Sequence, residues 1–600
     1  MGREFGLAAL AALAALVLAA SATAQQLPQS TARAPATQPV VFDVYLKLSH
    51  SADLDALLEE QQRPGSPDYH RWLTPAAFAA RFGAEPAQIA RVAAALRAVG
   101  LHVEPNGSHA LRATGTAATV ERALSTRLAT GRFADGHTRL VAEAPPVLPA
   151  ALAEAGAVVA HFMPAEHMRR HSRLVASNLP LNRISTTGLY WFDDLKQAYQ
   201  FPSYAVANGR GVTIGILMSN DFRPGDMDLY FGNENILPPP ITTEPIFGGA
   251  PFDPNLSDET SLDIQQAGGM APLASVILVN PPDLSDASLL AGLTTIVEDN
   301  TIDIVNMSFG APEAEYGPAY NGGVTYTGIL TVFDDMFRQG NAQGITFVAA
   351  AGDLGSRSLP AMACFLADAK TTCGGYRLSV EMPASSPHVT AVGGTNLVTF
   401  HDARNASDLR STYVSENARP DPLAEDIFFG TPAQHGLWGS GGGISTVFAQ
   451  PSYQTGVSPL STDWRIVPDI AFQMGGCPLG AVTPCGAGRS GVVAVLNGAA
   501  IGLVGTSAAA PGIAGLLALR VQLTHKRLGN ANPSIYALAA AQAAGTGARV
   551  FHNDTTGSNG TYRSTQGYNP VLGNGTPIAN AFLGVANKAA AGNPQTPSNP

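Results

Sequence analysis

The chain has little charge, few cysteines and few long apolar runs. Charged residues make up 14% of its 600 residues and the net charge is −11, whereas an ordinary soluble protein carries about 25% charged residues. Nucleic-acid binding needs clustered Lys and Arg, so we exclude nucleic acid as a partner. Hydrophobic residues reach 45%, which excludes wholesale disorder. The length predicts more than one domain.

The long apolar run of this chain lies at its beginning. Arg3 precedes an Ala/Leu-rich stretch at residues 6–20, and Ala22-Thr23-Ala24 supplies a small-x-small cleavage site. The run is short for a membrane span, so residues 1–24 are expected to be a signal peptide cut near Ala24. A single N-terminal anchor is the alternative. We therefore predict a secreted, extracellular protein that has no membrane association after signal removal, and we expect a monomer.

The sequence has only four cysteines, and they form two close pairs. Cys364 lies near Cys373, and Cys477 lies near Cys485. In an exported chain such pairs suit two local disulfides, each closing its own loop. A zinc site is the alternative, but neither pair has C-x-x-C spacing and no histidine lies nearby. We expect structural cross-links rather than chemistry.

The first part of the chain divides into three segments. Residues 25–39 form a Pro/Thr/Gln-rich lead, and residues 40–162 show the pattern of a compact α+β unit. Residues 163–184 follow as a polar linker with several Arg and His, which we expect to be exposed and therefore open to cleavage. In the α+β unit we expect the strands Val40–Leu48, Leu101–Glu104 and Ala110–Ala113 and the helices Ser51–Gln62, Pro86–Val99 and Thr119–Ser125.

From residue 185 the pattern changes to short apolar runs that alternate with helical segments. This alternation predicts a mostly parallel sheet with helices on both faces, in which working residues gather at the carboxyl ends of the strands. We assign residues 185–584 to this domain, with Gly-rich loops and one more helix after residue 400, and residues 585–600 to a disordered tail. The expected strands are Val212–Met218, Ser275–Val279, Asp303–Phe309, Ile345–Ala351 and Val389–Gly393, and the expected helices are Asp258–Gln266, Asp286–Asp299, Tyr326–Gln339 and Ser507–Leu523.

The first candidate for chemistry is a serine in Gly505-Thr506-Ser507. An apolar run, Val492–Val504, leads into this small-residue turn, and an Ala/Leu-rich helix follows it. A serine hydroxyl at a helix N-terminus lies in a positive field that favours a developing alkoxide. The alternative is that Ser507 only caps the helix. With Pro511 four residues on, the segment resembles the nucleophile segment of subtilisin-like enzymes.

A subtilisin-type site also needs a histidine base, and the sequence lacks one in a suitable context. None of the five histidines after residue 180 opens an H-G-x-x-V-A-G-like helix. Instead, Ser257 is expected to cap a helix that places Glu259 and Asp263 one turn apart on one face. Two carboxyls that close tend to share a proton. A solvated acidic helix face is the alternative.

A third carboxyl, Asp353, follows the apolar run Ile345–Ala351 directly. It is therefore expected at the carboxyl edge of the sheet, where sites form. A strand-end Asp can also be a simple turn residue, which is the alternative. Asp353 gains weight as a site candidate because the same chain offers a possible nucleophile and a carboxyl pair.

Together these pieces resemble the sedolisins, the serine-carboxyl peptidases, over nearly the whole chain after the signal. The segment Ser66–Pro75, which reads SPDYHRWLTP, is similar to the signature of a kumamolisin-type activation domain. The resemblance implies a subtilisin-like fold preceded by an α+β, ferredoxin-like prodomain. The other segments that resemble the family are Ser308-Phe309-Gly310, Pro383–Pro387, Val392–Thr395, Ser440–Ser445 and Pro468-Asp469.

By that resemblance Ser507 is the nucleophile, Glu259 the general base, Asp263 the residue that orients Glu259, and Asp353 the oxyanion-hole acid. A carboxylate base needs a raised pKa to remove a serine proton, and an aspartic acid donates a hydrogen bond only while it is protonated. Both requirements favour acid pH. The resemblance also assigns the backbone of substrate to the glycine run Gly441, Gly442 and Gly443, since glycine lets two backbones approach closely.

The calcium site of the sedolisins is altered in this sequence. The matching stretches are Asn553–Gly557 and Gly567–Asn569. The first holds Asn553 and the second Asn569 where the family has Asp. Calcium prefers charged oxygens, so its affinity should drop. Asp554 is a possible compensating ligand. We carry calcium as a possible cofactor, with Asn553, Asp554 and Asn569 as its candidate ligands.

These features predict a secreted, acid-active endopeptidase that is made as a self-processing zymogen, acts on protein or peptide substrates through an acyl-enzyme on Ser507, and has its own prodomain as inhibitor and chaperone. The alternatives are a tripeptidyl-peptidase of the same family, a neutral subtilisin-like serine peptidase and a non-catalytic binding protein.

The charge is distributed unevenly along the chain. Residues 25–180 hold 15 basic and 13 acidic side chains, whereas residues 181–600 hold 19 and 32, and eight of the 13 histidines lie in the first segment. If these histidines have ordinary pKa values, acid makes the prodomain strongly positive and weakens its attraction to the catalytic domain. Scattered histidines without a joint role are the alternative.

Overall fold

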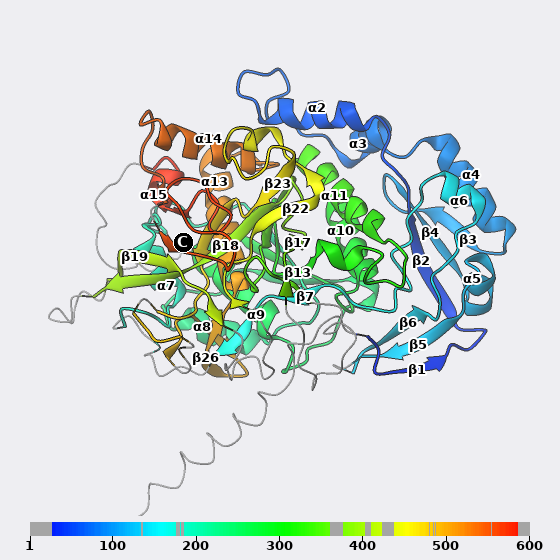
Figure 1. Cartoon of the computed structure of the whole chain (residues 1–600), viewed down its shortest axis with the longest axis horizontal. Helices are drawn as coiled ribbons and strands as arrows, with labels where there is room; N and C mark the ends of the chain where they lie inside the picture. Colours follow the sequence, from blue (N-terminus) through cyan, green and yellow to red (C-terminus); the bar gives the residue numbers. More distant parts are fainter. Residues whose placement is uncertain are drawn as a thin grey trace, which may run out of the picture.

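The computed structural model of the chain describes residues 27–585, except 134–135, 176–180, 182–184, 361–375, 402–409, 423–436, 479, 484, 486–487 and 554. The expected signal peptide, nearly all of the expected C-terminal tail and the Cys364/Cys373 pair lie outside these residues. Figure 1 shows the N-terminal unit, in blue and cyan, packed along one side of a larger domain coloured green to red.

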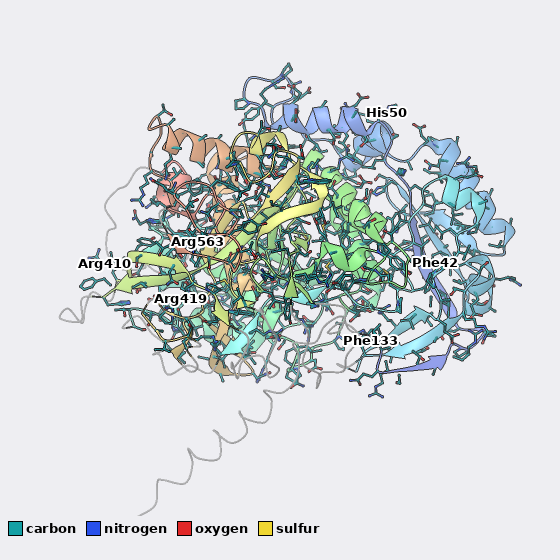
Figure 2. The ribbon with its side chains drawn as sticks, in the orientation of Figure 1. Phe42, His50, Phe133, Arg410, Arg419 and Arg563 are labelled. Carbon is teal, nitrogen blue, oxygen red and sulfur yellow. A yellow bond between two sulfur atoms is a disulfide. The ribbon has the colours of Figure 1, made fainter. Side chains whose placement is uncertain are left out.

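The N-terminal unit is built on two small antiparallel sheets. One has the order β2-β4-β3, with β2 at Pro39–Tyr45, β4 at Ala110–Thr116 and β3 at His102–Pro105. Helices α4 (Pro86–Ala98) and α5 (Ala117–Ala123) contact this sheet, and Phe42, labelled in Figure 2, is buried in the shared core. The second sheet has the order β1-β5-β6, with strands Ser30–Arg33, Leu128–Arg132 and Thr138–Ala142.

Two helices of this unit reach the larger domain. Helix α2 (Ser51–Gln62) begins and ends where the sequence predicts, and α3 (Pro75–Phe82) follows a loop. On α2, Asp55 binds Arg338 of the larger domain at 2.6 Å. The loop between the helices places Trp72 against Gly344, where an added Cβ would lie 2.8 Å from the indole ring. The N-terminal unit is therefore docked through specific polar and aromatic contacts.

The larger domain is organised around a nine-stranded sheet. Its order is β10-β11-β9-β12-β14-β18-β19-β28, with β24 paired to β18. Pairs from β10 to β18 are parallel, and β18 pairs with β19 in the antiparallel sense. The strands are β9 (Thr213–Leu217), β10 (Ile241–Pro245), β11 (Ser275–Asn280), β12 (Ile304–Met307), β14 (Thr346–Ala350), β18 (Thr390–Phe400), β19 (Thr412–Ala418), β24 (Ile470–Gln473) and β28 (Thr556–Gly557).

Four helices cover this sheet where the sequence predicts helices, so the subtilisin-like α/β fold is confirmed. They are α9 (Asp258–Met270), α10 (Asp286–Asp299), α11 (Thr327–Ala342) and α13 (Thr506–Thr524). The buried face of α13 packs on α9 and on the sheet, and both helices contribute to one continuous apolar core. Ser257 occupies the N-cap position of α9 as predicted, but its side chain makes no capping hydrogen bond.

Three other expectations need correction. The run Asp303–Phe309 is not one strand: it breaks at Ser308 into β12 and β13 (Phe309–Pro312), because Ser308 turns its polar groups toward the site described below. The run Val492–Val504 is a hairpin of β25 (Val492–Leu496) and β26 (Ala499–Val504), whose Asn497-Gly498 turn has positive φ at both residues. A second late helix, α14 (Asn532–Ala543), was missed because its Ala-rich sequence lacks apolar periodicity.

The linker is the segment whose structure differs most from the expectation. Its first residues were expected to be exposed, yet Met163, His167, Met168, His171 and Ser172 are all buried. Residues 169–175 form two short strands, β7 (Arg169–Arg170) and β8 (Arg173–Val175), on the larger domain. The cause is main-chain pairing, since β7 joins β13 and β8 joins β26. The linker backbone is therefore paired with the larger domain, and its basic residues between 167 and 173 are at most partly exposed.

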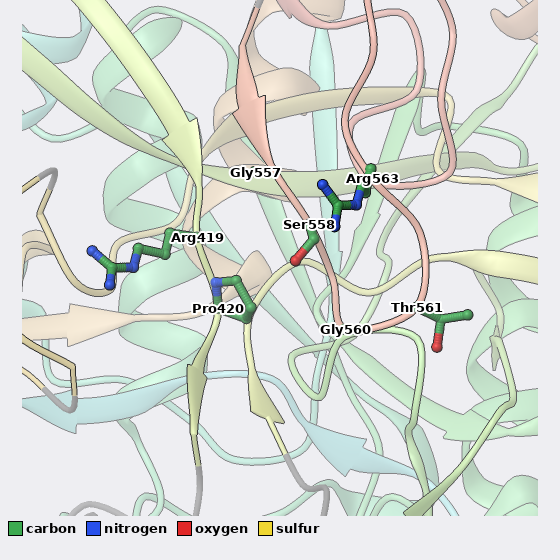
Figure 3. Close-up of a pocket in the computed structure, with 7 residues that line it drawn as sticks. All are labelled: Arg419, Pro420, Gly557, Ser558, Gly560, Thr561 and Arg563. Carbon is green, nitrogen blue, oxygen red and sulfur yellow. The ribbon is translucent and has the colours of Figure 1, made fainter.

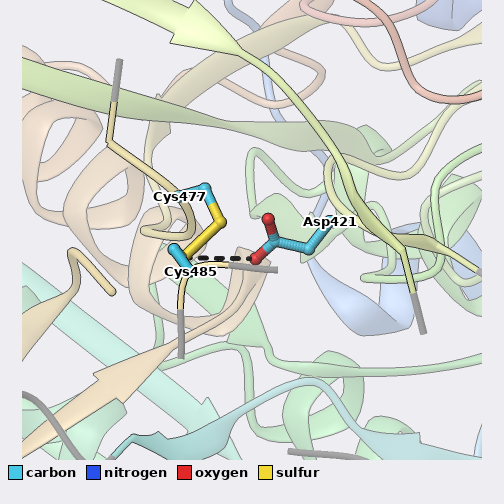
Figure 4. Close-up of side chains that lie close together, drawn as sticks. All are labelled: Asp421, Cys477 and Cys485. Atoms are coloured by element: carbon cyan, nitrogen blue, oxygen red, sulfur yellow. Dashed lines mark hydrogen bonds between the residues drawn. A yellow bond between two sulfur atoms is a disulfide. The ribbon is translucent and has the colours of Figure 1, made fainter. Parts of the chain in front are cut away.

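The predicted disulfide between Cys477 and Cys485 is present, and Figure 4 shows it beside Asp421. Asp421 accepts a hydrogen bond from the Arg489 guanidinium at 3.1 Å. Because each sulfur is bonded to the other, this pair is not a zinc site. Among the described residues, no helix is both long and apolar enough to span a membrane.

Candidate active site

Ser507 lies in the second position of α13, directly after the strand β26 and the turn residue Gly505. Gly505 occupies the N-cap position, so the alternative that Ser507 only caps the helix is excluded. The Ser507 side chain is buried, and its hydroxyl donates a hydrogen bond of 3.3 Å to the Ser308 carbonyl oxygen. The turn therefore places the hydroxyl at the point where β12 breaks.

Glu259 and Asp263 face this point from the first turns of α9. Both are fully buried, which excludes a solvated acidic face. The Ser308 hydroxyl donates a hydrogen bond of 2.6 Å to Asp263 Oδ1, so Ser308 contacts both the carboxyl pair and the serine. Neither oxygen of Glu259 accepts a hydrogen bond of ordinary length, which leaves this carboxyl available to take a proton.

The environment keeps these two carboxyls from ionising together. Burial, and then the charge of Asp258, raise the pKa of Glu259, while the nearby hydroxyls of Ser172 and Ser507 act in the opposite direction. Burial and then the Glu259 carboxylate raise the pKa of Asp263 well above its usual range. Each charge is costly beside the other in a fully buried site, so the pair holds at least one proton.

Asp353 follows β14 and lies against the turn before α13. Its Oδ1 accepts hydrogen bonds from the backbone nitrogen and the hydroxyl of Thr506, at 2.7 and 2.8 Å. Its Oδ2 is buried and has no hydrogen-bond partner. Burial raises the pKa of Asp353 to about 7, against the opposing effects of His171 and Thr506. Below that pH the acid is neutral and Oδ2 can donate a hydrogen bond.

The linker crosses this site with its backbone at the serine. The His171 amide nitrogen donates to the Ser308 carbonyl oxygen at 3.2 Å, and the His171 carbonyl oxygen accepts from the Ser507 amide nitrogen at 3.4 Å. Gly505 has a φ of +137°, and a Cβ there would lie 1.9 Å from the His171 oxygen and 2.8 Å from Asp353 Oδ2. Only glycine leaves room for the carbonyl between the helix N-terminus and Asp353.

The side chains of the linker meet carboxylates that sequence reasoning missed. His171 Nε2 lies 2.7 Å from Glu381 Oε2, and the Arg169 guanidinium forms an ion pair with Glu315. Burial lowers the pKa of His171, but the Glu381 carboxylate outweighs it and the pKa is raised. Glu381 comes two residues before the predicted Pro383–Pro387 segment, which was the signal available for it. Nothing in the local sequence marked Glu315.

The glycine run lies behind Asp353. The Gly441 amide donates to the Gly352 carbonyl oxygen at 2.7 Å, and a Cβ at Gly442 would meet the Pro570 oxygen at 2.2 Å. The linker backbone pairs with β13 and β26 instead. The structure thus brings Ser507, Glu259, Asp263 and Asp353 together but not the glycines with the linker, and substrate binding at Gly443 and its neighbours stays a prediction.

Of the candidate calcium ligands, Asn569 uses both atoms of its side-chain amide in hydrogen bonds within its own turn. Asn569 Oδ1 accepts hydrogen bonds from the amides of Val571 and Leu572, and its Nδ2 donates to the carbonyl oxygens of Thr565 and Gly567. The side-chain amide thereby ties this turn together by itself, and a donor NH₂ pointing at the carbonyls is incompatible with a cation there. Asp554 lies outside the described residues.

A cavity of about 550 Å³ lies away from the catalytic carboxyls, between the segments that follow β19 and β28. Figure 3 shows Arg419 and Arg563 at its border, with Ser558 and Thr561 also lining it. None of the four predicted catalytic residues lines it. The linker, by contrast, lies against the candidate site, where the His171 backbone bonds to Ser308 and Ser507.

Comparisons with known proteins agree with this geometry. A family model described as pro-kumamolisin, activation domain, matches residues 29–161, and one described as subtilase family matches residues 246–569. Kumamolisin of Bacillus sp. (strain MN-32) is 29% identical, covering 93% of this chain and 94% of that protein. Xanthomonalisin of Xanthomonas sp. (strain T-22) is 28% identical, covering 90% of this chain and 64% of that protein.

The fold has a solved counterpart in Pseudomonas sedolisin, a serine-carboxyl proteinase. The match has a TM-score of 0.53 at 23% identity and covers 67% of this chain and 98% of that structure. It supports the fold assignment, while the family models and the relatives support the enzyme class. The chain belongs to the subtilase family of serine peptidases and is a sedolisin-type member with an N-terminal pro-kumamolisin activation domain.

Proposed function

We propose that this protein is a secreted, acid-active serine-carboxyl endopeptidase that matures by cutting its own linker between His171 and Ser172. The observation that carries the proposal is the backbone of His171, held by Ser308 on its amide side and by Ser507 on its carbonyl side. An extended chain bound in this way presents its carbonyl carbon to a serine at the helix N-terminus.

The chemistry follows from the four residues. Glu259 takes the proton of the Ser507 hydroxyl as the oxygen bonds to the His171 carbonyl carbon. The carbonyl oxygen becomes an oxyanion that accepts hydrogen bonds from the Ser507 amide and from protonated Asp353. Glu259 then gives its proton to the Ser172 nitrogen as the peptide bond breaks, and water releases the acyl-enzyme by the same steps. Asp263 is a positioning residue that holds the second proton of the pair.

Acid activity is supported by the raised pKa of Asp353. Asp353 donates a hydrogen bond only while protonated, so its contribution is lost as pH rises through its pKa of about 7. The carboxyl pair must hold one negative charge to provide a base, and this sets the lower limit of activity. When the linker leaves, water reaches Glu259 and reduces the desolvation that raises its pKa, which moves that limit further into acid.

The path of the linker favours internal cleavage over removal of N-terminal tripeptides. Before His171 the chain continues through Arg170 and Arg169 to the buried residues Met168 and His167, and after Ser172 it continues as β8. A chain therefore passes the serine with residues bound on both sides, and no N-terminal amine is held three residues before the cut. Export by the predicted signal peptide remains part of the proposal.

The test is peptide cleavage by purified protein at about pH 4, in the range where carboxyl groups titrate. We expect Ser507→Ala to lose cleavage by a factor of about a thousand or more. The matched control is Ser534→Ala on α14, where the hydroxyl bonds only to the Ala531 carbonyl oxygen. Cleavage by pure Ser507→Ala protein at the rate of the control would refute the assignment.

A further inference from the structure

The linker offers a bound chain on which the subsites of the cleft can be identified. Counting back from the proposed scissile bond, Arg169 is the third residue, and it pairs with Gly310 of β13. Alternate side chains of an extended strand point to the same side, so Arg169 and His171 share a side and Arg170 points away. The contacts agree: Arg169 reaches Glu315, whereas Arg170 donates to the Ser219 carbonyl oxygen at 3.3 Å.

Glu315 is held in place by its own domain. It lies in the short 3-10 helix η2 (Glu313–Tyr316) directly after β13 and is fully buried. Its carbonyl oxygen accepts a hydrogen bond from Asn321 at 2.7 Å. The next residue, Tyr316, donates its hydroxyl to Asp286 at 2.6 Å. Contacts within the catalytic domain thus hold the backbone of Glu315 beside the linker.

The cations around this carboxylate come from the linker. Burial raises the pKa of Glu315, and the two positive groups that lower it are Arg169 and His167. Both residues belong to the linker, whereas the other charged neighbour, Glu381, belongs to the catalytic domain and raises the pKa. One oxygen, Oε2, has no hydrogen-bond partner. Loss of the linker leaves a pocket with a carboxylate that lacks a cation, and an incoming substrate that supplies one regains the interaction.

We propose that Glu315 determines specificity at the third residue before the cleaved bond, where it selects arginine. The inference rests on the proposed function, because it assumes that substrates occupy the cleft in the way the linker does. It adds a substrate class: chains whose third residue before the cut is cationic. The guanidinium suits the position because it carries a permanent charge and several donors at the end of a long side chain.

The experiment uses the full chain after acid processing and two synthetic peptides. The peptides share one sequence and differ only in arginine or citrulline, its uncharged isostere, at the third position before the cut. We expect kcat/KM to favour the arginine peptide by about tenfold or more, the size of one hydrogen bond to a charged group. Glu315→Gln should bring the ratio of the two kcat/KM values close to one.

The control is Glu313→Gln, in the same 3-10 helix. Glu313 is also buried, but it binds the Ser445 hydroxyl and the Thr446 amide rather than the linker. The Glu313→Gln substitution should leave the preference for the arginine peptide unchanged. A ratio near one in the native enzyme, or an equal preference in Glu315→Gln, would overturn the inference. Failure of the native enzyme to cut either peptide would refute the proposed peptidase function, and the inference with it.

A second variant keeps the test decisive if Glu315→Gln does not fold. Arg169→Gln changes only the linker, and we expect self-processing to slow by about tenfold. Arg169→Lys should restore most of the rate, because it returns the charge. Equal processing rates for the Gln and Lys variants would overturn the role of this ion pair.

Discussion

Burial shifts the pKa values of three carboxyls in the catalytic domain and of two histidines in the prodomain in opposite directions, because it disfavours the charged form of each. In the catalytic domain burial raises the pKa of Glu259, Asp263 and Asp353, so each is more easily neutral than an ordinary carboxyl. In the prodomain burial lowers the pKa of His109 and His161 to about 4. Acid pH therefore favours the neutral form of the buried catalytic carboxyls and destabilises the docked state of the prodomain.

Each of these shifts changes the stability of the protein with pH in a definite direction. A carboxyl with a raised pKa destabilises the folded protein at neutral pH, and that cost disappears as pH falls. A histidine whose pKa drops from 6.5 to about 4 costs stability as pH falls through this interval, because the undocked form binds the proton first. Both histidines lie near the interface: His161 is influenced by Asp283 of the catalytic domain, and Tyr45 beside His109 packs into the catalytic core.

This comparison corrects the expectation that eight ordinary histidines charge the prodomain in acid. The pKa of His70 is lowered as well, whereas that of His171 is raised. The buried histidines His109 and His161 therefore oppose docking in acid. The lesson is that position in the interface matters more than the number of histidines.

The largest effect is expected for the substitution Glu259→Gln. The change removes the base, so cleavage should fall by a factor of about a thousand or more. It also removes a carboxyl whose raised pKa makes it take up a proton on folding at pH 7, so thermal stability at pH 7 should rise, by about 1 kcal/mol or more in free energy of unfolding. Kinetics and melting curves check both halves, and a loss of stability together with activity would contradict the view that this carboxyl is strained at neutral pH.

Two substitutions of Asp353 distinguish the effect of its hydrogen bond from the effect of its titration. Asp353→Ala removes the oxyanion donor and should cost about a hundredfold to a thousandfold in kcat. Asp353→Asn keeps a donor that does not titrate, so the activity that remains should persist above pH 7. The measurement is kcat as a function of pH for both variants. A high-pH limb at the same position in Asp353→Asn would show that another group controls it.

In the prodomain, the double substitution His109→Gln and His161→Gln should lower the pH midpoint of self-processing by about half a unit to one unit. The reason is that the protonation of these two histidines, which favours undocking in acid, is then lost. Gel analysis of processing against pH gives the midpoint. The matched control is His50→Gln with His102→Gln, since both side chains are exposed. An equal shift in the control would restore the simple charge hypothesis.

The smallest effect is expected at the altered calcium site. Because Asn569 already satisfies the carbonyl and amide groups of its turn, chelator should leave the melting temperature unchanged. A thermal melt with and without chelator, repeated with added calcium, measures this. A drop of several degrees that calcium reverses would show that Asp554 and its neighbours bind the ion.

The sequence predicted most of the fold and the four residues that the structure brings together at the candidate site, because strand-helix alternation and short motifs carry that information locally. Helix α2 and helix α10 begin and end as expected. The break at Ser308 and the burial of the linker could not be predicted, since both depend on pairing between residues more than a hundred positions apart. Glu315 was missed for the same reason: only the bound linker shows what its carboxylate faces.

The most direct test of the account is the N-terminus of the acid-processed protein. The purified full chain and its Ser507→Ala variant are brought to about pH 4, and the first new N-terminus is sequenced at early times. The account predicts that native protein is cut between His171 and Ser172, so that the new chain begins at Ser172, while the variant stays intact. A first cut outside residues 163–184, or the same cut in the variant, would contradict it.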